Sequence, residues 1–372
     1  MSQSKVVILS LTVSFLLGAG FPNCPRLIAR GAMGAGENEV RGVWMSPGYF
    51  GPEKKTAVPQ IQAVLDEYQK SGINTVIVMV KSTSGLVYYK SRIAQADTAW
   101  NWDFFGVFLE EARKRHMVVH PWFCVFTESG ITGHIRQHPE WLIRSRKSEL
   151  VSVVNPALPE VRSYEAGLMV ELAREYPVDW IHLDYIRYPC EPTENYYSFD
   201  AQTRARFKEY SGEDPLSIKA TDSGNILWNE WIAWNGKQVE QFIRELRETL
   251  KTVGRPVKIS AAVFPNADNA KVLIGQDWAQ WANDGVVDML CPMLYTNNFE
   301  FFEEYAKRAV DIAGGHCRVC VGIGIGTSHN QNTPDGVLKQ IEIGRKLKAD
   351  GFILFSSSSL KPEFLQAIET TK

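Results

Sequence analysis

Short segments that are almost continuously apolar alternate along most of the chain with longer segments whose apolar residues recur every three to four positions. Continuous apolar segments are typical of strands that are buried on both faces, and the wider spacing is typical of helices with one buried stripe. This pattern predicts eight strands, at residues 41–45, 73–80, 117–126, 179–188, 258–265, 286–295, 318–325 and 351–356.

Helices are predicted between and after these strands, at residues 58–71, 104–116, 160–176, 228–253, 278–283, 300–313, 334–349 and 362–370, with a short one expected around 201–210. The repeated order of strand and helix indicates a parallel sheet that closes into a (β/α)8 TIM barrel, a fold of the α/β class. An open doubly wound sheet is the alternative. It is disfavoured because the turn after the first strand, "MSPGYFG", lacks the glycine spacing that a dinucleotide needs.

The N-terminal residues 1–22 have the arrangement of a secretory signal peptide, with one Lys, an apolar run at 6–17 and then small residues. That run is too short to span a bilayer comfortably. A flexible, Gly-rich linker is predicted at 23–40 and a single barrel domain at 41–372. We therefore expect a secreted or periplasmic protein without a membrane partner after signal cleavage. Lipid anchoring at Cys24 is a less favoured alternative that stays open. The residues before Cys24 match a lipobox poorly.

The composition argues against several partners. Forty basic and forty-two acidic residues give a formal charge of -2, which does not indicate nucleic acid or an anionic membrane as a partner. Eleven Trp and thirteen Tyr favour a cleft for a sugar, because their rings stack on sugar faces. The pair Cys317 and Cys320 has no second pair to complete a zinc site, so we predict no metal and no cofactor.

The fourth predicted strand ends in a carboxylate, at the edge of the barrel where active sites of this fold lie. Side chains alternate along a strand, so His182 and Asp184 share the face toward the barrel interior, while Leu183 and Tyr185 share the face toward the helices. His182 could donate a hydrogen bond to Asp184, and Arg187 could pair with it. The alternative is an Asp184 and Arg187 ion pair that only fastens the next loop, with His182 as a buried structural residue.

Other strand ends carry residues that could contact a glycan. The predicted sugar platforms are aromatic and comprise Trp44, Trp122, Tyr295 and one of Tyr196 or Tyr197. Trp122 is expected to face the barrel interior. Lys81 and Asn155 are predicted to supply polar contacts to the same substrate.

Several motifs occur in the order seen in one family of barrels, among them "RGVWMSP", "HMVVHPWF", "VNPALPEVR", "VDWIHLDYIRYP" and "VVDMLCPMLY". Over roughly residues 41–295 the sequence resembles the glycosyl hydrolase-like ten family. The resemblance implies a glycosidase-related barrel that hydrolyses a polysaccharide, and one bacterial branch is associated with peptidoglycan strands stripped of their peptides. It also implies that Asp184 matches the family's Asp at the end of strand four and that Arg187 matches the Arg that follows it. Asn155 matches the family's Asn after strand three.

Glycoside hydrolysis usually needs two carboxyl groups that flank the scissile bond. Asp184 is the first candidate. Members of the family often have Asn or Glu two residues after the Trp of strand three, where this chain has Cys124, so Glu128 is our candidate for the second. The other acidic residues near strand ends are Asp268, Glu300, Glu191 and Glu194.

Two further functions stay open at this stage. A barrel that binds glycans without cutting them would also lack a clear second carboxylate. A metabolic enzyme for a phosphorylated substrate could use the loops "GIGTSHN" and "FSSSS" at the ends of strands seven and eight. The signal peptide and the lack of Lys or Arg in those loops disfavour this second function.

Overall fold

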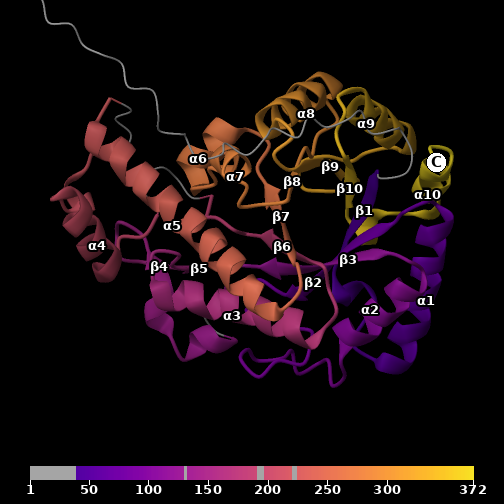
Figure 1. Cartoon of the computed structure of the whole chain (residues 1–372), viewed down its shortest axis with the longest axis horizontal. Helices are drawn as coiled ribbons and strands as arrows, with labels where there is room; N and C mark the ends of the chain where they lie inside the picture. Colours follow the sequence, from indigo (N-terminus) through magenta and orange to yellow (C-terminus); the bar gives the residue numbers. More distant parts are fainter. Residues whose placement is uncertain (1–38, 130–131, 191–196, 220–223) are drawn as a thin grey trace, which may run out of the picture. The chain divides into compact units, whose positions relative to one another are not determined.

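Eight parallel strands close into a barrel in the computed structural model, which describes residues 39–129, 132–190, 197–219 and 224–372 (Figure 1). In order around the barrel they are β1 (Val40–Met45), β2 (Thr75–Lys81), β3 (Val118–Cys124), β6 (Trp180–Asp184), β7 (Lys258–Val263), β8 (Met289–Pro292), β9 (Arg318–Gly324) and β10 (Gly351–Phe355). Pairing of Val40 with Gly351 joins the first strand to the last. The predicted (β/α)8 barrel is therefore confirmed.

Helices surround this ring of strands (Figure 1). They are α1 (Lys54–Lys70), α2 (Phe104–Lys114), α3 (Pro159–Glu175), α4 (Ala201–Ser211), α5 (Ile226–Leu250), α6 (Ala267–Ile274), α7 (Trp278–Asn283), α8 (Phe299–Ala313), α9 (Pro334–Lys346) and α10 (Pro362–Glu369). The sequence pattern missed only α6 among these, although Asn266 caps it by accepting a hydrogen bond from the Asn269 N–H. Within the described ranges, no helix is long and apolar enough to cross a membrane.

Some sequence predictions fall outside the described residues. They concern the signal peptide at 1–22, Cys24, nearly all of the linker at 23–40, and the candidates Glu191, Glu194 and Tyr196. Secretion, lipid anchoring and the roles of these side chains therefore stay predictions.

The interior of the barrel holds a separate apolar cluster, distinct from the larger core between strands and helices. Trp44, Trp122, Trp180 and Cys124 belong to the interior cluster. Gly322 makes room for it, because a Cβ at that position would lie 2.9 Å from the Pro292 carbonyl oxygen and 3.3 Å from the Trp44 ring. Trp122 therefore faces the interior, as its alternation along the strand predicts.

A hairpin that the hydrophobic pattern did not predict lies between β3 and α3. Its strands β4 (Leu142–Arg144) and β5 (Leu150–Val154) pair antiparallel and are short, which explains why no periodicity was visible. The Glu128 N–H donates to the Ser152 carbonyl at 3.0 Å, and the Val154 N–H donates to the Phe126 carbonyl at 2.7 Å. The hairpin thus docks on the continuation of β3 beyond the barrel.

The fourth barrel strand ends earlier than predicted, at Asp184 instead of residue 188. Tyr185 has φ 50°, in the left-handed region that residues other than glycine rarely adopt. The prediction that Tyr185 faces the helices is wrong, because strict alternation holds only while the backbone stays extended. Its ring instead packs against the interior cluster, on the side of Asp184.

Candidate active site

Asp184 lies at the carboxyl end of β6, and only 6% of its surface is exposed. Its Oδ1 accepts hydrogen bonds from the Tyr185 N–H at 2.6 Å and from the Arg187 guanidinium at 3.1 Å. Among the described residues, none donates a hydrogen bond to Oδ2, and this atom is not fully buried. One carboxylate oxygen is thus fixed by the protein and the other is left for solvent or a substrate.

Arg187 holds the carboxylate from a position between two aromatic rings. Its guanidinium carbon lies 4.4 Å from the centre of the Tyr185 ring and 5.1 Å from that of Phe264. Cation–π contacts of this kind restrict the arginine side chain. A positive charge is therefore fixed beside the Asp184 carboxylate.

Tyr295 lies near the same carboxylate, on the loop after β8. Its ring stacks on Phe355 with centroids 5.2 Å apart and an angle of 25° between the planes. Burial, and to a smaller extent the charge of Asp184, raises the pKa of Tyr295 well above its usual value, so its hydroxyl stays neutral. Its predicted role as a sugar platform stays a prediction.

Beneath the site, a chain of hydrogen bonds crosses the barrel interior. The Trp44 indole N–H donates to Nε2 of His182 at 3.1 Å, and Nδ1 of His182 lies 2.9 Å from the Ser260 hydroxyl oxygen. The same hydroxyl oxygen lies 2.9 Å from Nδ1 of His120. The expected bond from His182 to Asp184 is therefore wrong, since both ring nitrogens of His182 are engaged elsewhere.

Burial keeps both histidines of this chain neutral. It lowers the pKa of His182 to about 3, and together with the nearby His182 it lowers that of His120 well below the usual value. Trp44 and His182 are 1% and 0% exposed, so the structure places them under the site and not at its surface. Direct contact of either residue with a glycan stays a prediction.

The neutral histidines make stability depend on pH. Unfolded histidines titrate near pH 6.5, so between pH 6.5 and 3 the unfolded chain binds protons that buried His182 does not. We expect the free energy of unfolding to be retained above pH 6.5 and to fall steadily as the pH drops toward 3. His182→Gln, which can accept from Trp44 but does not titrate, should flatten this slope in urea denaturation at a series of pH values.

His116→Gln supplies the control for this experiment, because it makes the same substitution at an exposed histidine outside the buried chain of hydrogen bonds. A slope that is equally steep in His182→Gln would show that the acid sensitivity comes from other groups.

Lys81 and Glu128 meet in a buried ion cluster with Glu165 of α3. Nζ of Lys81 lies 2.7 Å from Glu128 and 2.8 Å from Glu165, and it donates to the carbonyls of Cys124 and Val125 at 3.1 and 2.9 Å. Burial alone lowers the pKa of Lys81, but the charges of Glu128 and Glu165 outweigh this effect and the pKa is raised. Burial raises the pKa of Glu165 well above its usual value, and the charge of Lys81 offsets only part of that rise.

This cluster lies one strand away from Asp184, since Cys124 is the register partner of Asp184 across β3 and β6. Glu128 is only 1% exposed, so the structure places it in an ion cluster and not at the surface of a cleft. The sequence pattern missed Glu165. A single charge inside the otherwise mostly apolar stretch "YEAGLMV" of a helix was the signal that could have found it.

The other predicted contacts lie in supporting positions. Asn155 is 0% exposed and donates to Asp200 at 2.8 Å and to Thr203 at 2.6 Å, at the start of α4. Tyr197 is buried, and its hydroxyl donates to the carbonyl oxygen of Val272. Asp268 forms an exposed ion pair with Arg308.

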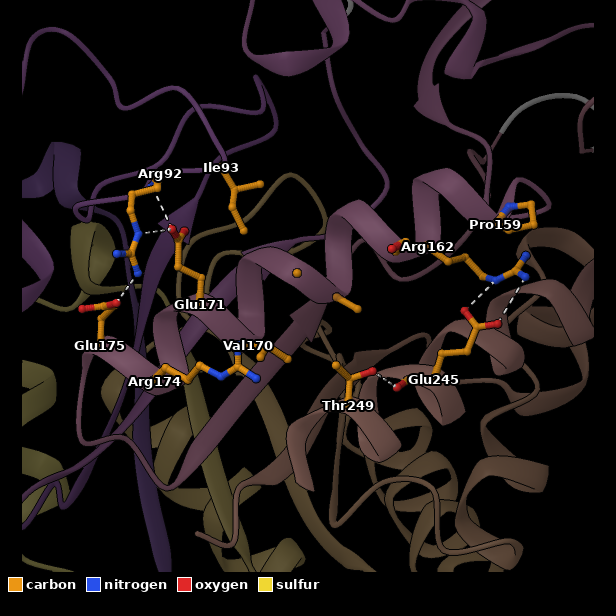
Figure 2. Close-up of a pocket in the computed structure, with 13 residues that line it drawn as sticks. Arg92, Ile93, Pro159, Arg162, Val170, Glu171, Arg174, Glu175, Glu245 and Thr249 are labelled. Atoms are coloured by element: carbon orange, nitrogen blue, oxygen red, sulfur yellow. Dashed lines mark hydrogen bonds and ion pairs between the residues drawn. The ribbon is translucent and has the colours of Figure 1, made fainter. Parts of the chain in front are cut away.

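Two surface cavities matter for assigning the site. A cavity of about 540 Å³ lies between the β4–β5 hairpin and the loop after β6, and Arg187 lines it. A larger groove of about 660 Å³ lies on the outside of α3 and α5 (Figure 2). In that groove Arg92 pairs with Glu175 and Arg162 pairs with Glu245, so the cavity lined by Arg187, the partner of Asp184, is the better candidate.

The loops considered for phosphate are filled by their own side chains. The Asn330 amide donates to the Gly324 carbonyl at 2.9 Å, and the Ser359 hydroxyl donates to the Gly326 carbonyl at 3.3 Å. Close packing therefore explains these glycines. Among the described residues there is also no group of three or more His, Cys, Asp or Glu side chains that could hold a metal ion.

A family model described as Glycosyl hydrolase-like 10 matches residues 39–340. The chain belongs to the glycosyl hydrolase-like 10 family. Glycosyl hydrolase YngK of Bacillus subtilis (strain 168) is 23% identical over 328 residues, which cover 77% of this chain and 59% of YngK. Glycosyl hydrolase DigH of Escherichia coli O6:H1 is 24% identical over 398 residues, which cover 88% of this chain and 85% of DigH. The chain thus spans less than two thirds of YngK.

Solved structures of glycosidases share the fold of this glycosyl hydrolase-like 10 member. The PgaB (BpsB) glycoside hydrolase domain from Bordetella bronchiseptica has a TM-score of 0.71 at 14% identity, over 89% of this chain and 98% of that domain. The endo-1,4-beta-D-mannanase from Thermotoga petrophila RKU-1 has a TM-score of 0.58 at 11% identity, over 90% of this chain and 99% of that one. At such identities the likeness shows the fold, and family membership carries the classification as a glycosidase.

Proposed function

We propose that this protein is a secreted or periplasmic glycoside hydrolase that cleaves a polysaccharide at the carboxyl end of its barrel. One observation carries the proposal: no described residue donates to Oδ2 of Asp184 at the end of β6, while Arg187 and the Tyr185 N–H fix its Oδ1. A negative charge held in this way suits the stabilisation of an oxocarbenium-like transition state. The family membership of the chain supports a glycan as the substrate.

For the substrate, we propose peptidoglycan glycan strands or another β-linked polysaccharide. Incubation of the purified protein with denuded peptidoglycan and a panel of β-linked polysaccharides should release oligosaccharides from at least one of them, as followed by chromatography and mass spectrometry. Release from none of these substrates would contradict hydrolysis.

A glycan-binding barrel without hydrolysis is the second candidate. The burial of Glu128 in the cluster with Lys81 supports it, because a carboxylate engaged in a buried ion pair is a poorer candidate for the second carboxylate than one that faces a cleft. Tight binding of one glycan by the wild-type protein, together with no release of oligosaccharides, would select this function.

A further inference from the structure

The backbone of Tyr185 brings an aromatic ring to the side of Asp184. Its φ of 50° is disfavoured for a tyrosine, and the surrounding structure must hold it in place. The conformation moves the ring from the helix layer, where alternation would put it, to the interior cluster and to the wall of the neighbouring cavity. Residues held in such conformations cluster at binding and catalytic sites.

This cavity has the size and the lining of a small-molecule site. Its volume is about 540 Å³, within the usual range for such pockets. Tyr185 and Arg187 line it from the loop after β6, which we call the first wall, and Leu150, Val151 and Ser152 line it from the β4–β5 hairpin. Leu150 is 52% exposed although it is a large apolar side chain.

Hydrogen-bond donors on the first wall are unused. Among the described residues, none bonds to the Tyr185 hydroxyl, and Arg187 makes its one hydrogen bond to Asp184 with a single guanidinium nitrogen. Burial, and after it the charge of Asp184, raises the pKa of Tyr185, so the hydroxyl stays protonated and can donate. A ring face, a phenol and spare guanidinium N–H groups together match a pyranose ring, which has an apolar face and a rim of hydroxyls.

The charges around the cavity decide which kind of sugar fits. Of the described residues that line it, only Arg187 and Glu149 are charged. Asp184 already balances the charge of Arg187 at 3.1 Å, and Glu149 adds a negative charge. A carboxylated sugar would therefore meet no net positive charge there.

We propose that the cavity between the β4–β5 hairpin and the β6 loop is a subsite for an uncharged pyranose residue of the substrate, with Tyr185 as its aromatic wall and specificity-determining residue. This inference rests on the proposed function, because the cavity is lined by Arg187, which holds Asp184.

The test uses two variants, one on each of the two segments that line the cavity. Tyr185→Asn removes the ring at a position whose left-handed backbone Asn tolerates well, and Ser152→Trp fills the cavity from an exposed position on the hairpin. Tyr185→Phe keeps the ring, and Tyr210→Asn changes an exposed tyrosine of α4 as a matched control. We would measure Tm, then KM and kcat on the glycan that the wild type cleaves. Calorimetry in an Asp184→Asn background would give the Kd for chitotetraose, cellotetraose and tetragalacturonate.

Tyr185→Asn and Ser152→Trp should each raise KM, and the Kd for a neutral tetrasaccharide, at least about tenfold, with a much smaller change in kcat. Tyr185→Phe keeps the ring but loses the donor, so its rise in KM and Kd should be smaller than that of Tyr185→Asn, and Tyr210→Asn should bind almost as the wild type does. Unchanged binding in both wall variants, or tighter binding of tetragalacturonate than of the neutral sugars, would overturn the subsite while leaving the proposed function intact. If the wild type neither cleaves nor binds any glycan, the proposed function fails, and this inference fails with it. Should Tyr185→Asn not fold, Ser152→Trp alone decides.

Discussion

Asp184→Asn is expected to slow the release of oligosaccharides by about 10²- to 10⁴-fold, as is usual when an acid–base group is lost, and by more if Asp184 is the nucleophile. The amide keeps the shape of the carboxylate, but it carries neither the negative charge nor the proton that the transition state needs. Initial rates on the glycan that the wild type cleaves would measure the loss.

The stability of the same variant separates catalysis from structure. Asn can still accept the Tyr185 N–H and the Arg187 guanidinium through its Oδ1, so we expect the Tm to change little. Asp268→Asn is the matched control, because the Asp268 side chain is 77% exposed and pairs with Arg308 of α8 at the surface. A large drop in Tm with nearly full activity in Asp184→Asn would show that the ion pair with Arg187 only fastens the loop.

The barrel itself could be predicted because each of its strands is buried on both faces and each helix on one. Those two burial patterns are periodic over short distances, so the local sequence contains them. The alternation of side chains along a strand also predicts that Trp122 and Asp184 face the barrel interior, since both lie on strands whose backbone is still extended. The same rule failed one residue later, at Tyr185, where φ becomes 50°.

The ion cluster of Lys81, Glu128 and Glu165 could not be predicted from the sequence, because its members are far apart along the chain. Lys81 and Glu165 are 84 positions apart, and no local period links a strand end to the buried face of a helix. Glu128 was chosen as a catalytic acid because it follows β3, but the direction of its side chain depends on where Lys81 lies in the folded protein. Contacts between distant segments, and not local propensity, decide whether such a carboxylate faces solvent or an ammonium group.

Lys81→Met is expected to destabilise the protein by roughly 3–5 kcal/mol, because it leaves the negative charge of the Glu128 and Glu165 pair without its counter-charge in the interior. The change preserves most of the apolar stem of the side chain, so little of the loss should come from a cavity. Urea denaturation and Tm would measure it. Removing the charges together, in Lys81→Met/Glu128→Gln/Glu165→Gln, should recover a large part of the lost stability, since no buried charge then stays unpaired.

Lys114 provides the matched control on the surface of the same molecule. It also contacts two glutamates, Glu110 and Glu111, each at 2.8 Å, but its side chain is 54% exposed. Water and salt screen such a pair, so Lys114→Met should leave the Tm almost unchanged. If Lys81→Met were as stable as Lys114→Met, the two buried carboxylates would have to be neutral in the folded protein. In that case the predicted role of Glu128 as the acid partner of Asp184 would gain support.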